Sequence, residues 1–481
     1  MSNGNFIPFG ESIKGRLVAA GLPTAAYRPA HKHDSNVDRR TVPWFSTTPW
    51  GALLCAVYPL AAIAPLVALH ILSPRTDHSM TTQLGINCAL VGFTLLSMQF
   101  VLTARLPWIE AAFGLDLIVR FHRVMALVIV ALLCAHPVLI ASDQGWRLIT
   151  RFHARWYIWT GRIALLLLLA QVISAMLRRV MRLPYERWKQ IHNGVALSIL
   201  ALGFVHGMRT GDELRNVGGQ MLWAVMPAVG LATWLYSRAI RPHLLARRPF
   251  RVQSVKLEAP RVWTVTLSTP PGRPFRFFPG QFQFLRLLDS DAPAEEHPFS
   301  IASSSSQTDR VGLTIKACGD FTALIERIRV GDRATVQGPF GRFSHDLHPG
   351  EKDLVFVAGG VGITPLMSML RAMYDRRESR QVTLIYASRG PDDILFTAEL
   401  VALEATQSPA LKVIYVLSGP PSWWTGETGH VDARRLREWC GGLEDKAFYM
   451  CCPTRMNAEL VRGLRNLGVS PRHIHCDSFS F

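Results

Sequence analysis

Six long apolar stretches in the first half of the chain restrict its fold more than any other feature. A helix needs about 20 residues to cross the roughly 30 Å of hydrocarbon in a bilayer, and each stretch is near that length. They cover approximately residues 50–72, 84–103, 118–140, 157–177, 191–208 and 218–237. Because soluble proteins rarely contain so many apolar runs of this length, we predict a six-helix transmembrane bundle over residues 49–240.

The basic residues predict the orientation of this bundle. An even number of spans leaves both chain ends on one side, and Lys and Arg concentrate on the cytoplasmic side of a membrane. One side collects Lys14, Arg16, Arg28, Lys32, Arg39, Arg40, Arg178, Arg179, Arg182, Arg187, Lys189, Arg238, Arg241, Arg247 and Arg248. We therefore expect a multi-pass protein of the cell (inner) membrane with cytoplasmic N- and C-termini, although Arg147, Arg151 and Arg155 fall on the opposite side. Residues 1–48 lack the apolar core of a signal peptide and are interpreted as a cytosolic tail.

Two other interpretations find no support in the sequence. The net charge of +17 comes from basic residues that are dispersed or flank apolar runs, without the basic-aromatic stripe that indicates nucleic-acid binding. The eight cysteines include no C-x-x-C pair. Neither a cysteine zinc site nor a disulfide framework is therefore predicted.

Histidines occur as matched pairs in the third and fifth stretches. His122 and His136 are fourteen residues apart, and so are His192 and His206. Fourteen residues make just under four helical turns, so the two imidazoles of each helix lie on one face, about 21 Å apart. Because the two helices run in the same direction, His122 lies level with His192 (the inner pair) and His136 lies level with His206 (the outer pair). We predict two stacked b-type haems, each held between two neutral imidazoles.

A single membrane histidine more often has a plainer role, such as hydrogen-bonded packing, and we assign His70 and His78 to it. Burying a matched set of four rings in lipid without partners would cost several kcal/mol for each ring, which favours coordination. Two axial imidazoles leave the iron no open position, so such haems carry single electrons. Arg162, in the outer half of the fourth helix, either neutralises a haem propionate or extends to the membrane surface.

The second half of the chain has the pattern of two soluble domains. Short alternating strands with Gly and Pro turns over residues 245–346 predict an antiparallel β-barrel. Residues 350–481 contain apolar strands that alternate with helices, which predicts a parallel α/β sheet. The expected fold class is a multi-domain membrane protein in which the six-helix haem bundle precedes these two domains.

The barrel carries a motif that suits a flavin. EEHPFSIASS (295–304) follows the turn PGQF (279–282) and precedes LTIKACGDFT (313–322). A flavin requires an aromatic cover, a hydroxyl at its reactive edge, and cations or backbone donors at its diphosphate. Lys316 and the Gly319–Thr322 turn could supply the last of these.

The α/β domain carries a motif that suits a dinucleotide. VFVAGGVGITP (355–365) is a strand, a glycine turn and a helix start. Its three glycines let the backbone approach a pyrophosphate at the N-terminus of the helix. Thr364 is expected to cap that helix and Pro365 to fit its first turn.

With these motifs on both domains, the chain resembles a known family. Its soluble half resembles the ferredoxin–NADP reductase superfamily, and residues 50–481 resemble a prokaryotic member of the ferric reductase and NADPH oxidase family. The resemblance implies FAD and NADPH as cofactors beside the haems. It implies flavin contacts from His297, Pro298, Phe299, Ser300, Lys316, Gly319, Phe321, Thr322 and Phe481, and dinucleotide contacts from Gly359, Gly360, Gly362, Thr364, Pro365, Ser388, Arg389, Cys451 and Pro453.

The resemblance also implies individual roles near the reacting atoms. Phe299 is expected against the isoalloxazine ring, Ser300 near flavin N5, and Cys451 beside the nicotinamide, so these three residues form the catalytic set. Phe481 is expected to cover the flavin face that the nicotinamide must enter. His297 stands where many reductases have an arginine, as it does in oxidase-like members.

Other positions bear on the choice and placement of the dinucleotide. Arg389, beside Ser388, suits a ribose 2′-phosphate, which favours NADPH over NADH. The segment YMCCPTRM resembles the family's Cys-Gly-Pro turn, but Cys452 replaces the glycine, which leaves the conformation of the turn open. Near the C-terminus, Asp477 occupies the position at which members of the family more commonly have a glutamate.

The function implied is electron transfer from cytosolic NADPH, via FAD and two haems, to a small extracytoplasmic acceptor. Dioxygen, giving superoxide, ranks first because HPFS resembles the oxidase version of the motif. The alternatives are a ferric chelate, a periplasmic partner protein or, in another class, a haem-binding transporter or sensor. The outer arginines Arg147, Arg151, Arg155, Arg209 and Arg215 could retain an anionic chelate, stabilise superoxide, or bind lipid headgroups.

Overall fold

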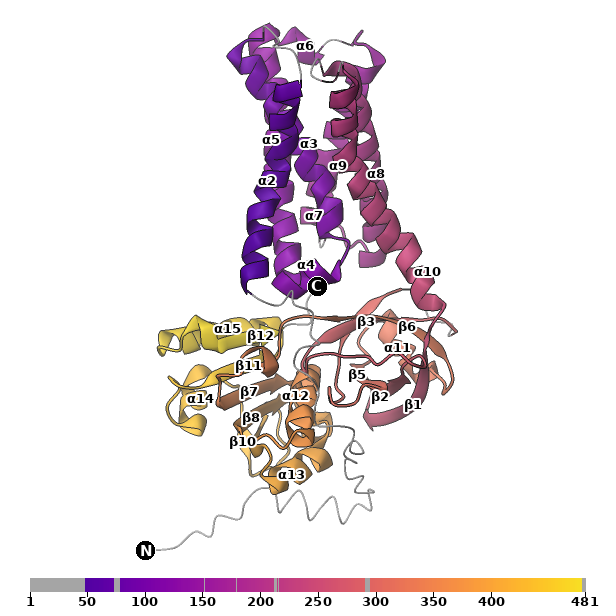
Figure 1. Ribbon diagram of the computed structural model, residues 1–481. Helices are drawn as coiled ribbons and strands as arrows, with labels where there is room; N and C mark the ends of the chain where they lie inside the picture. The colour runs from indigo at the N-terminus through magenta and orange to yellow at the C-terminus, as the bar shows by residue number, and fades with distance from the viewer. Residues whose placement is uncertain are drawn as a thin grey trace, which may run out of the picture. The chain divides into compact units, whose positions relative to one another are not determined.

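The computed structural model describes residues 48–72, 78–150, 152–178, 180–211, 214, 216–289 and 295–477. The N-terminal tail through residue 47, the single residues Arg151, Arg179 and Arg215, and residues 478–481, which include Phe481, therefore lie outside the described residues. The chain forms two compact units, which divide between Leu244 and Leu245 (Figure 1).

The first unit is a bundle of long helices. These are α2 (Thr48–Leu72), α3 (Met80–Leu102), α5 (Leu115–Gln144), α7 (Trp156–Leu177), α8 (Tyr185–Thr210) and α9 (Val217–Leu235). Short helices α4 (Pro107–Phe113) and α6 (Arg147–Thr150) lie in the connections.

Five of these helices, α2, α3, α5, α7 and α8, are long and apolar enough to cross a membrane among the residues described. The protein is thus a multi-pass membrane protein. The sixth predicted stretch is helical, but Gly, Gln and Pro227 dilute the apolar character of α9, so a sixth span stays a prediction. A π-helical turn (Tyr236–Ile240) and α10 (Arg241–Ala246) continue from α9 to the second unit.

Helix α3 is the central helix of the bundle and packs closely against α5. It packs against α2, α5 and α9, and it is the most buried of the candidate spans. A Cβ at Gly85 would lie 3.2 Å from the His136 backbone oxygen, and one at Gly92 would lie 2.9 Å from Leu133. Small residues allow this close approach between membrane helices, and they place α5, which carries two of the predicted ligands, against the core.

The second unit begins with an antiparallel sheet. Its strands are β1 (Phe250–Ala259), β2 (Val262–Ser268), β3 (Phe282–Leu287), β4 (His297–Ser300), β5 (Arg310–Lys316) and β6 (Arg333–Phe340). They run in the order β4-β3-β6-β1-β2-β5, and a bridge between Ile301 and Leu313 joins the two ends into a barrel. Alternate residues such as Val265, Leu267 and Ile315 fill its interior.

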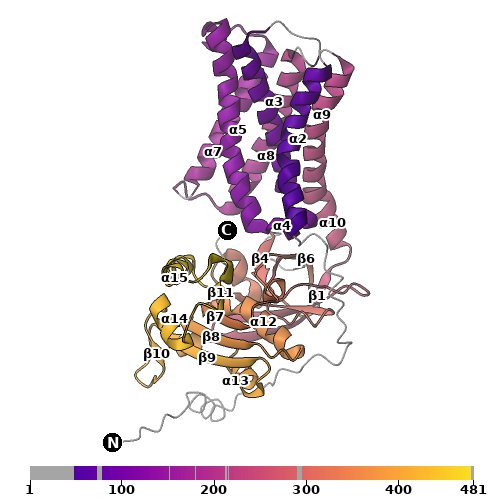
Figure 2. The same cartoon turned by 60° about the vertical axis from the view of Figure 1, so that its left-hand side comes forward.

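A parallel sheet follows, with strands β7 (Asp353–Gly359), β8 (Gln381–Ser388), β9 (Ala410–Leu417), β10 (Glu427–Thr428), β11 (Ala447–Cys451) and β12 (Ile474–Asp477). Helices α12 (Ile363–Asp375) and α13 (Thr397–Thr406) pack on one face of the sheet, while α14 (Ala433–Cys440) and α15 (Thr454–Asn466) pack on the other (Figure 2). The predicted antiparallel and parallel sheets are confirmed.

The order of the parallel strands locates the binding edge of this sheet. The order is β10-β9-β8-β7-β11-β12. From β7 the chain first builds outward through β8, β9 and β10, and then returns to the other side of β7 with β11. Ligands of open α/β sheets bind beyond the carboxyl ends of the strands at such a switch point. The turns that follow β7 and β11 are therefore the expected dinucleotide site.

Candidate functional site

The four membrane histidines meet as two facing pairs. His122 and His136 extend from α5, and His192 and His206 extend from α8. The ring centroids of the inner pair are 6.4 Å apart at an interplanar angle of 69°, and those of the outer pair are 6.3 Å apart at 75°. The structure thus brings together, at matching separations, the two pairs that the sequence spacing predicts.

These separations fit a metal ion between each pair. A metal–imidazole bond is about 2.0–2.1 Å long, so two bonds in line, each continued to the centre of its ring, make roughly 6 Å. The four side chains could therefore hold two metal centres, one between each pair.

The outer pair has hydrogen-bond partners that fix its orientation. His136 Nδ1 lies 3.0 Å from the Gly85 carbonyl oxygen, and His206 Nδ1 lies 2.9 Å from the Tyr157 carbonyl oxygen. A carbonyl only accepts, so Nδ1 carries the proton in both rings and Nε2 is left with a free lone pair. That tautomer is the one a metal ligand requires.

A glycine on the neighbouring helix makes room for the outer pair. A Cβ at Gly161 of α7 would lie 2.7 Å from His206 Nδ1. Any side chain there would displace the imidazole from its hydrogen bond. Sequence reasoning missed Gly161, because nothing in the sequence shows which helix faces His206.

The inner pair lacks these partners. Among the described residues, the buried Nδ1 atoms of His122 and His192 have no hydrogen bond. Instead, the indole of Trp188 packs on His192, with ring centroids 4.8 Å apart and an interplanar angle of 37°. Sequence reasoning also missed Trp188, although its position four residues before His192 on one helix is the spacing of stacked neighbours.

Arg162 is engaged at the outer end of the bundle. Its guanidinium donates to the Leu148 carbonyl oxygen at 2.9 Å and lies 4.9 Å from the centre of the Trp159 ring. These contacts hold the charge beside the short helix α6, so neither expected role for Arg162 is selected over the other.

In the barrel, the strand HPFS presents two aromatic residues on one face. The His297 ring stacks on Phe321, with centroids 4.1 Å apart at 28°, and the Phe299 ring lies 6.1 Å from Phe321 at 27°. His297 also lies 3.2 Å from a Glu295 carboxylate oxygen. Three nearly parallel rings therefore meet at β4, where the flavin is expected. Pro298 lies between His297 and Phe299 along this strand.

Ser300 ends the same strand on its opposite face. It is buried, and no hydrogen bond joins its hydroxyl to any residue that the structure describes. A hydroxyl without a protein partner is free to bond to a ligand. This is the condition that the expected contact with flavin N5 requires.

In the turn expected to bind the flavin diphosphate, some of the donors already have hydrogen-bond partners within the protein. The Thr322 hydroxyl accepts hydrogen bonds from the backbone N–H groups of Cys318 and Gly319, both at 2.9 Å. Lys316 pairs with Asp393 at 3.4 Å on an exposed surface. Both Lys316 and these amides would have to exchange partners to reach a phosphate.

The glycine turn after β7 is shaped by the turn after β11. A Cβ at Gly362 would lie 2.0 Å from the Cys451 carbonyl oxygen, and one at Gly359 would lie 2.6 Å from Pro453 Cδ. Gly360 has φ +55° with open space around it. Two of the three glycines are thus required by the neighbouring turn at the switch point, a reason that the local motif did not reveal.

Thr364 does not cap α12 as predicted. The helix starts at Ile363 after Gly362, so Thr364 is already its second residue. Its hydroxyl donates to the Val361 carbonyl oxygen at 3.0 Å, because the three-residue 3-10 turn ahead of the helix supplies that acceptor. Pro365 does lie in the first turn of α12.

The residues expected at the ribose phosphate end β8. Ser388 is the buried last residue of that strand, and Arg389 follows it with an exposed side chain. Within the described residues the Arg389 guanidinium has no carboxylate partner. An unpaired guanidinium at the carboxyl edge of the sheet can bind a phosphate as a fork.

The conformation of the Cys451–Pro453 turn explains how Cys452 can stand in place of a glycine. Cys452 does not have a positive φ, and its thiol packs in the core, where it donates to the Val357 carbonyl oxygen at 3.4 Å. Cysteine therefore replaces glycine here without backbone strain. Asn457 ties this turn to the last strand, because its amide donates to the Cys452 and Asp477 carbonyl oxygens at 3.1 and 2.8 Å.

The Cys451 side chain is completely buried beside Asp477, its register partner on β12. Burial raises the pKa of the Cys451 thiol well above its usual value, and the nearby Asp477 carboxylate adds to this shift. The thiol is therefore neutral at physiological pH. It can position a neighbour by contact, but it is not a thiolate nucleophile.

Helix α12 holds the segment that follows HPFS, which sequence reasoning also missed. Ser368 donates to the Ser303 carbonyl oxygen at 2.7 Å, and Arg371 donates to the Ala302 carbonyl oxygen at 2.6 Å. The same arginine pairs with Glu399. The helix behind the dinucleotide turn thus anchors the chain beside the flavin strand.

One further cavity, of about 480 Å³, lies away from HPFS. It is lined by Gln253, Ser254, Thr264, Thr266, Ser303, Ser304, Gln307, Arg310, Gly312 and Arg371. Most of these residues lie on the face of β1, β2 and β5 opposite the barrel core. The cavity is therefore distinct from the expected flavin site.

Three family models match successive parts of the chain. The ferric reductase like transmembrane component matches residues 88–203, the FAD-binding domain matches residues 247–341, and the oxidoreductase NAD-binding domain matches residues 356–462. The first of these segments includes His122, His136 and His192 and ends three residues before His206. The other two include the HPFS strand and the glycine turn.

Individual relatives are reductases. NADH–cytochrome b5 reductase 1 of Arabidopsis thaliana is 34% identical over 197 residues, which cover 40% of this chain and 69% of that protein. Reductase component 1 of the terephthalate 1,2-dioxygenase of Comamonas sp is 26% identical over 317 residues, covering 64% of this chain and 92% of that protein. The solved ferredoxin reductase in carbazole 1,9a-dioxygenase is 26% identical with a TM-score of 0.42, covering 48% of this chain and 69% of that one.

Proposed function

We propose a complete transmembrane electron path for this chain, which is an NAD(P)H- and FAD-dependent oxidoreductase of the ferric reductase and NADPH oxidase type. Electrons enter from cytosolic NADPH, and a small acceptor at the extracytoplasmic face is reduced one electron at a time. The observation that carries the proposal is the pair of imidazole separations, 6.4 and 6.3 Å, at two levels of one bundle.

The residues of the soluble unit bind and align the cofactors. The glycine turn and the start of α12 receive the dinucleotide pyrophosphate, Arg389 holds its 2′-phosphate, and Ser300 donates its free hydroxyl at the reactive edge of the flavin. Cys451, at the end of β11, helps to align the nicotinamide through the turn that it begins. FAD, when bound, supplies the exchange between a two-electron hydride and single electrons, and two b-type haems supply one-electron carriers.

His122 with His192, and His136 with His206, would each hold one haem, and a haem held by two imidazoles would supply a one-electron carrier and no site for binding a substrate. An energised cell membrane is positive outside, so outward electron flow gains about 2.3 kcal/mol per electron per 100 mV. This gain favours transfer from the cytoplasm outward.

Dioxygen is the proposed acceptor, with superoxide as product, on the basis of the HPFS motif. A ferric chelate is the second candidate, because Arg147, Arg155 and Arg209 are exposed at the end of the bundle that holds the outer pair. A cluster of exposed guanidinium groups would raise the local concentration of an anionic chelate.

The decisive experiment uses the full-length protein with bound FAD. NADPH is added under anaerobic conditions and haem spectra are recorded; air or a ferric chelate is then admitted, and cytochrome c reduction is followed with and without superoxide dismutase. We expect reduced b-type haem followed by a dismutase-sensitive signal. A signal that requires the chelate selects the second candidate, and reduced haem that neither acceptor oxidises points to a partner protein. Absence of haem, or haem that NADPH does not reduce, overturns the path.

The preference for NADPH is tested separately at Arg389. Replacing Arg389 with Gln removes the guanidinium and its interaction with the 2′-phosphate. We expect KM for NADPH to rise by about tenfold or more while KM for NADH changes little, since a charged hydrogen bond contributes about 1.5–3 kcal/mol. Equal changes for both dinucleotides would contradict this assignment.

A further inference from the structure

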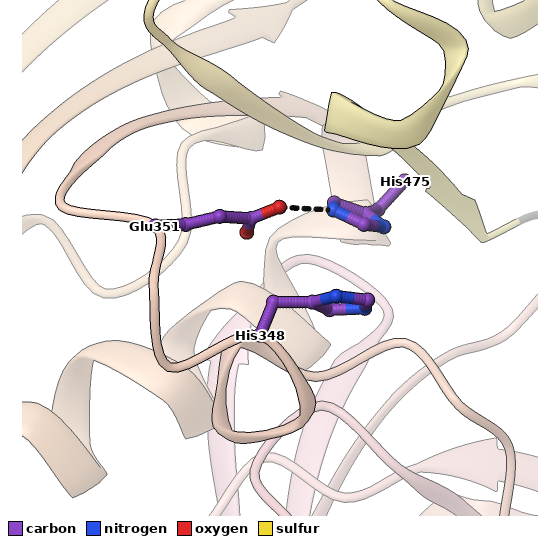
Figure 3. Close-up of side chains that lie close together, drawn as sticks. All are labelled: His348, Glu351 and His475. Atoms are coloured by element: carbon purple, nitrogen blue, oxygen red, sulfur yellow. Dashed lines mark hydrogen bonds and ion pairs between the residues drawn. The ribbon is translucent and has the colours of Figure 1, made fainter. Parts of the chain in front are cut away.

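Two histidines and a glutamate outside the electron path lie together in the soluble unit (Figure 3). His348 and Glu351 are the ends of the turn His348–Pro349–Gly350–Glu351, which is closed by a hydrogen bond from the Glu351 N–H to the His348 carbonyl oxygen at 3.1 Å. His475 comes from β12, the last described strand. The turn brings two of the side chains to one side, and the parallel sheet delivers the third.

The three side chains already interact. His475 Nε2 lies 2.8 Å from Glu351 Oε1, and the imidazoles of His348 and His475 lie one over the other, with centroids 4.2 Å apart at 33°. One possible ligand atom from each residue can be chosen so that all three lie within 4.8 Å of one another. The ring nitrogens of His348 have no hydrogen bond to the described residues.

A buried tyrosine fixes the carboxylate from behind. The Tyr449 hydroxyl donates to Glu351 Oε2 at 2.6 Å, and the Tyr449 ring stacks on His475, with centroids 4.5 Å apart at 28°. One carboxylate oxygen is thus held by tyrosine while the other faces the imidazoles. Carboxylates that bind metals through one oxygen are commonly oriented in this way by a hydrogen bond to the other.

We propose that His348, Glu351 and His475 bind a divalent transition-metal ion, with Zn²⁺ as the best fit. Two imidazoles and one carboxylate are a known zinc ligand set, with water as the fourth ligand. Bonds of about 2.0–2.2 Å place ligand atoms roughly 3–3.5 Å apart around a tetrahedral ion. The present separations need only side-chain rotation to turn a nitrogen of each ring toward the common point.

A second group of possible ligands shows why this one is selected. His345, Asp346 and Glu378 also lie together, but Arg376 contacts both of their carboxylates, at 2.8 and 3.6 Å, and Arg380 contacts Glu378 at 3.3 Å. Those carboxylates already have cationic partners, which a metal ion would have to displace. No arginine or lysine pairs with Glu351 among the described residues.

The site would link two segments of the parallel-sheet domain near the amino end of β7. The turn at 348–351 precedes β7, and His475 lies two residues before Asp477, whose carbonyl oxygen is bonded to Asn457 beside Cys452. A metal ion would therefore secure the last strand to the segment that joins the barrel to the parallel sheet. Its role is to stabilise this strand, and it takes no part in the electron path.

The test uses the full-length holoenzyme, purified without a polyhistidine tag and stripped of loose metal with a chelator. Zinc sulfate is titrated, and bound zinc is counted by elemental analysis, in which iron reports haem independently. Zinc K-edge absorption gives the ligands. We expect one Zn²⁺ per chain with only nitrogen and oxygen ligands at about 2.0–2.1 Å, two of them imidazoles.

Matched variants distinguish zinc bound at this site from zinc bound by other histidines of the protein. His348→Ala and Glu351→Gln should each weaken zinc binding by about 100-fold or more, and Tyr449→Phe should weaken it about 10–100-fold as an orienting residue. His430→Ala, an exposed histidine elsewhere on the unit, should leave binding unchanged. Flavin content and circular dichroism verify folding in each variant. Equal zinc binding by the wild type and His348→Ala, or sulfur among the ligands, overturns the proposal.

Discussion

The two histidine pairs of the membrane unit have the same spacing but different surroundings. In the outer pair, backbone carbonyls of Gly85 and Tyr157 hold Nδ1 of each ring. In the inner pair, neither Nδ1 has a partner within the described residues, and an indole packs on one ring. The outer imidazoles are thus oriented by the protein before any metal binds, and the inner ones by packing.

This difference has chemical consequences. A hydrogen bond from Nδ1 makes an imidazole a more basic ligand and fixes its rotation. The outer site is therefore expected to favour oxidised iron more than the inner site does. Repeated ligand spacing in a sequence thus does not imply two equivalent sites.

Removing one ligand from each pair should have the largest effects and should distinguish the two pairs. His206→Leu is expected to remove the outer haem and abolish reduction of the external acceptor, while NADPH still reduces the inner haem. His192→Leu should remove the inner haem and leave the outer one oxidised, because its only source of electrons is lost. Haem content per chain and NADPH-reduced spectra check both outcomes; full haem content in either variant would contradict the assignment.

Gly161→Ala should disturb the outer pair alone. The new Cβ would lie 2.7 Å from His206 Nδ1, so the imidazole must leave its bond to Tyr157. Loss of a hydrogen bond that orients a metal ligand lowers metal affinity or activity by about 10–100-fold. We therefore expect the rate of reduction of the external acceptor to fall by that factor. Gly194→Ala, on α8 near the inner pair with no atom within 4 Å of the new Cβ, is the matched control and should change nothing.

Ser300→Ala should act on both pairs equally, because the flavin precedes both. Loss of one hydrogen bond of about 0.5–1.5 kcal/mol predicts a fall of up to about tenfold in the rate at which NADPH reduces haem. Haem content should remain that of the wild type. Stopped-flow absorbance at the haem bands measures the rate, and unequal slowing of the two haems would speak against a shared upstream step.

Trp188→Phe should have the smallest effect and should act on the inner pair alone. Phenylalanine keeps an aromatic contact with His192 but loses part of its area, so inner-haem binding should weaken by less than about tenfold. The midpoint potential of the outer haem should not move. A spectroelectrochemical titration that shows a shift of the outer haem instead would place Trp188 in a different role.

The sequence allowed much of the candidate site to be anticipated. Fourteen-residue spacing on two parallel helices brought His122 to His192 and His136 to His206, because helical periodicity is set locally. The family matches confirm the recognition that rested on HPFS, the glycine turn and the cysteine turn. The prediction that Thr364 caps α12 was wrong, because the 3-10 turn before α12 shifts the N-cap to Gly362.

The glycines show most clearly where local reasoning ended. Gly359 and Gly362 were assigned to a pyrophosphate, yet their nearest neighbours are Pro453 and the Cys451 carbonyl, which come almost a hundred residues later. Cys452 can replace glycine because its thiol packs in the core. Such requirements depend on which strand lies beside which, and no single motif contains that information.

By itself, the sequence determined the apolar lengths, the helical faces that carry histidine, and the alternation that separates barrel from parallel sheet, since each follows from the chemistry of neighbouring residues along the chain. The tertiary structure alone decided which atoms surround those residues: the carbonyls on the outer imidazoles, the indole on an inner one, and the meeting of His348, Glu351 and His475. These contacts join segments far apart in the chain, and packing in three dimensions selects them.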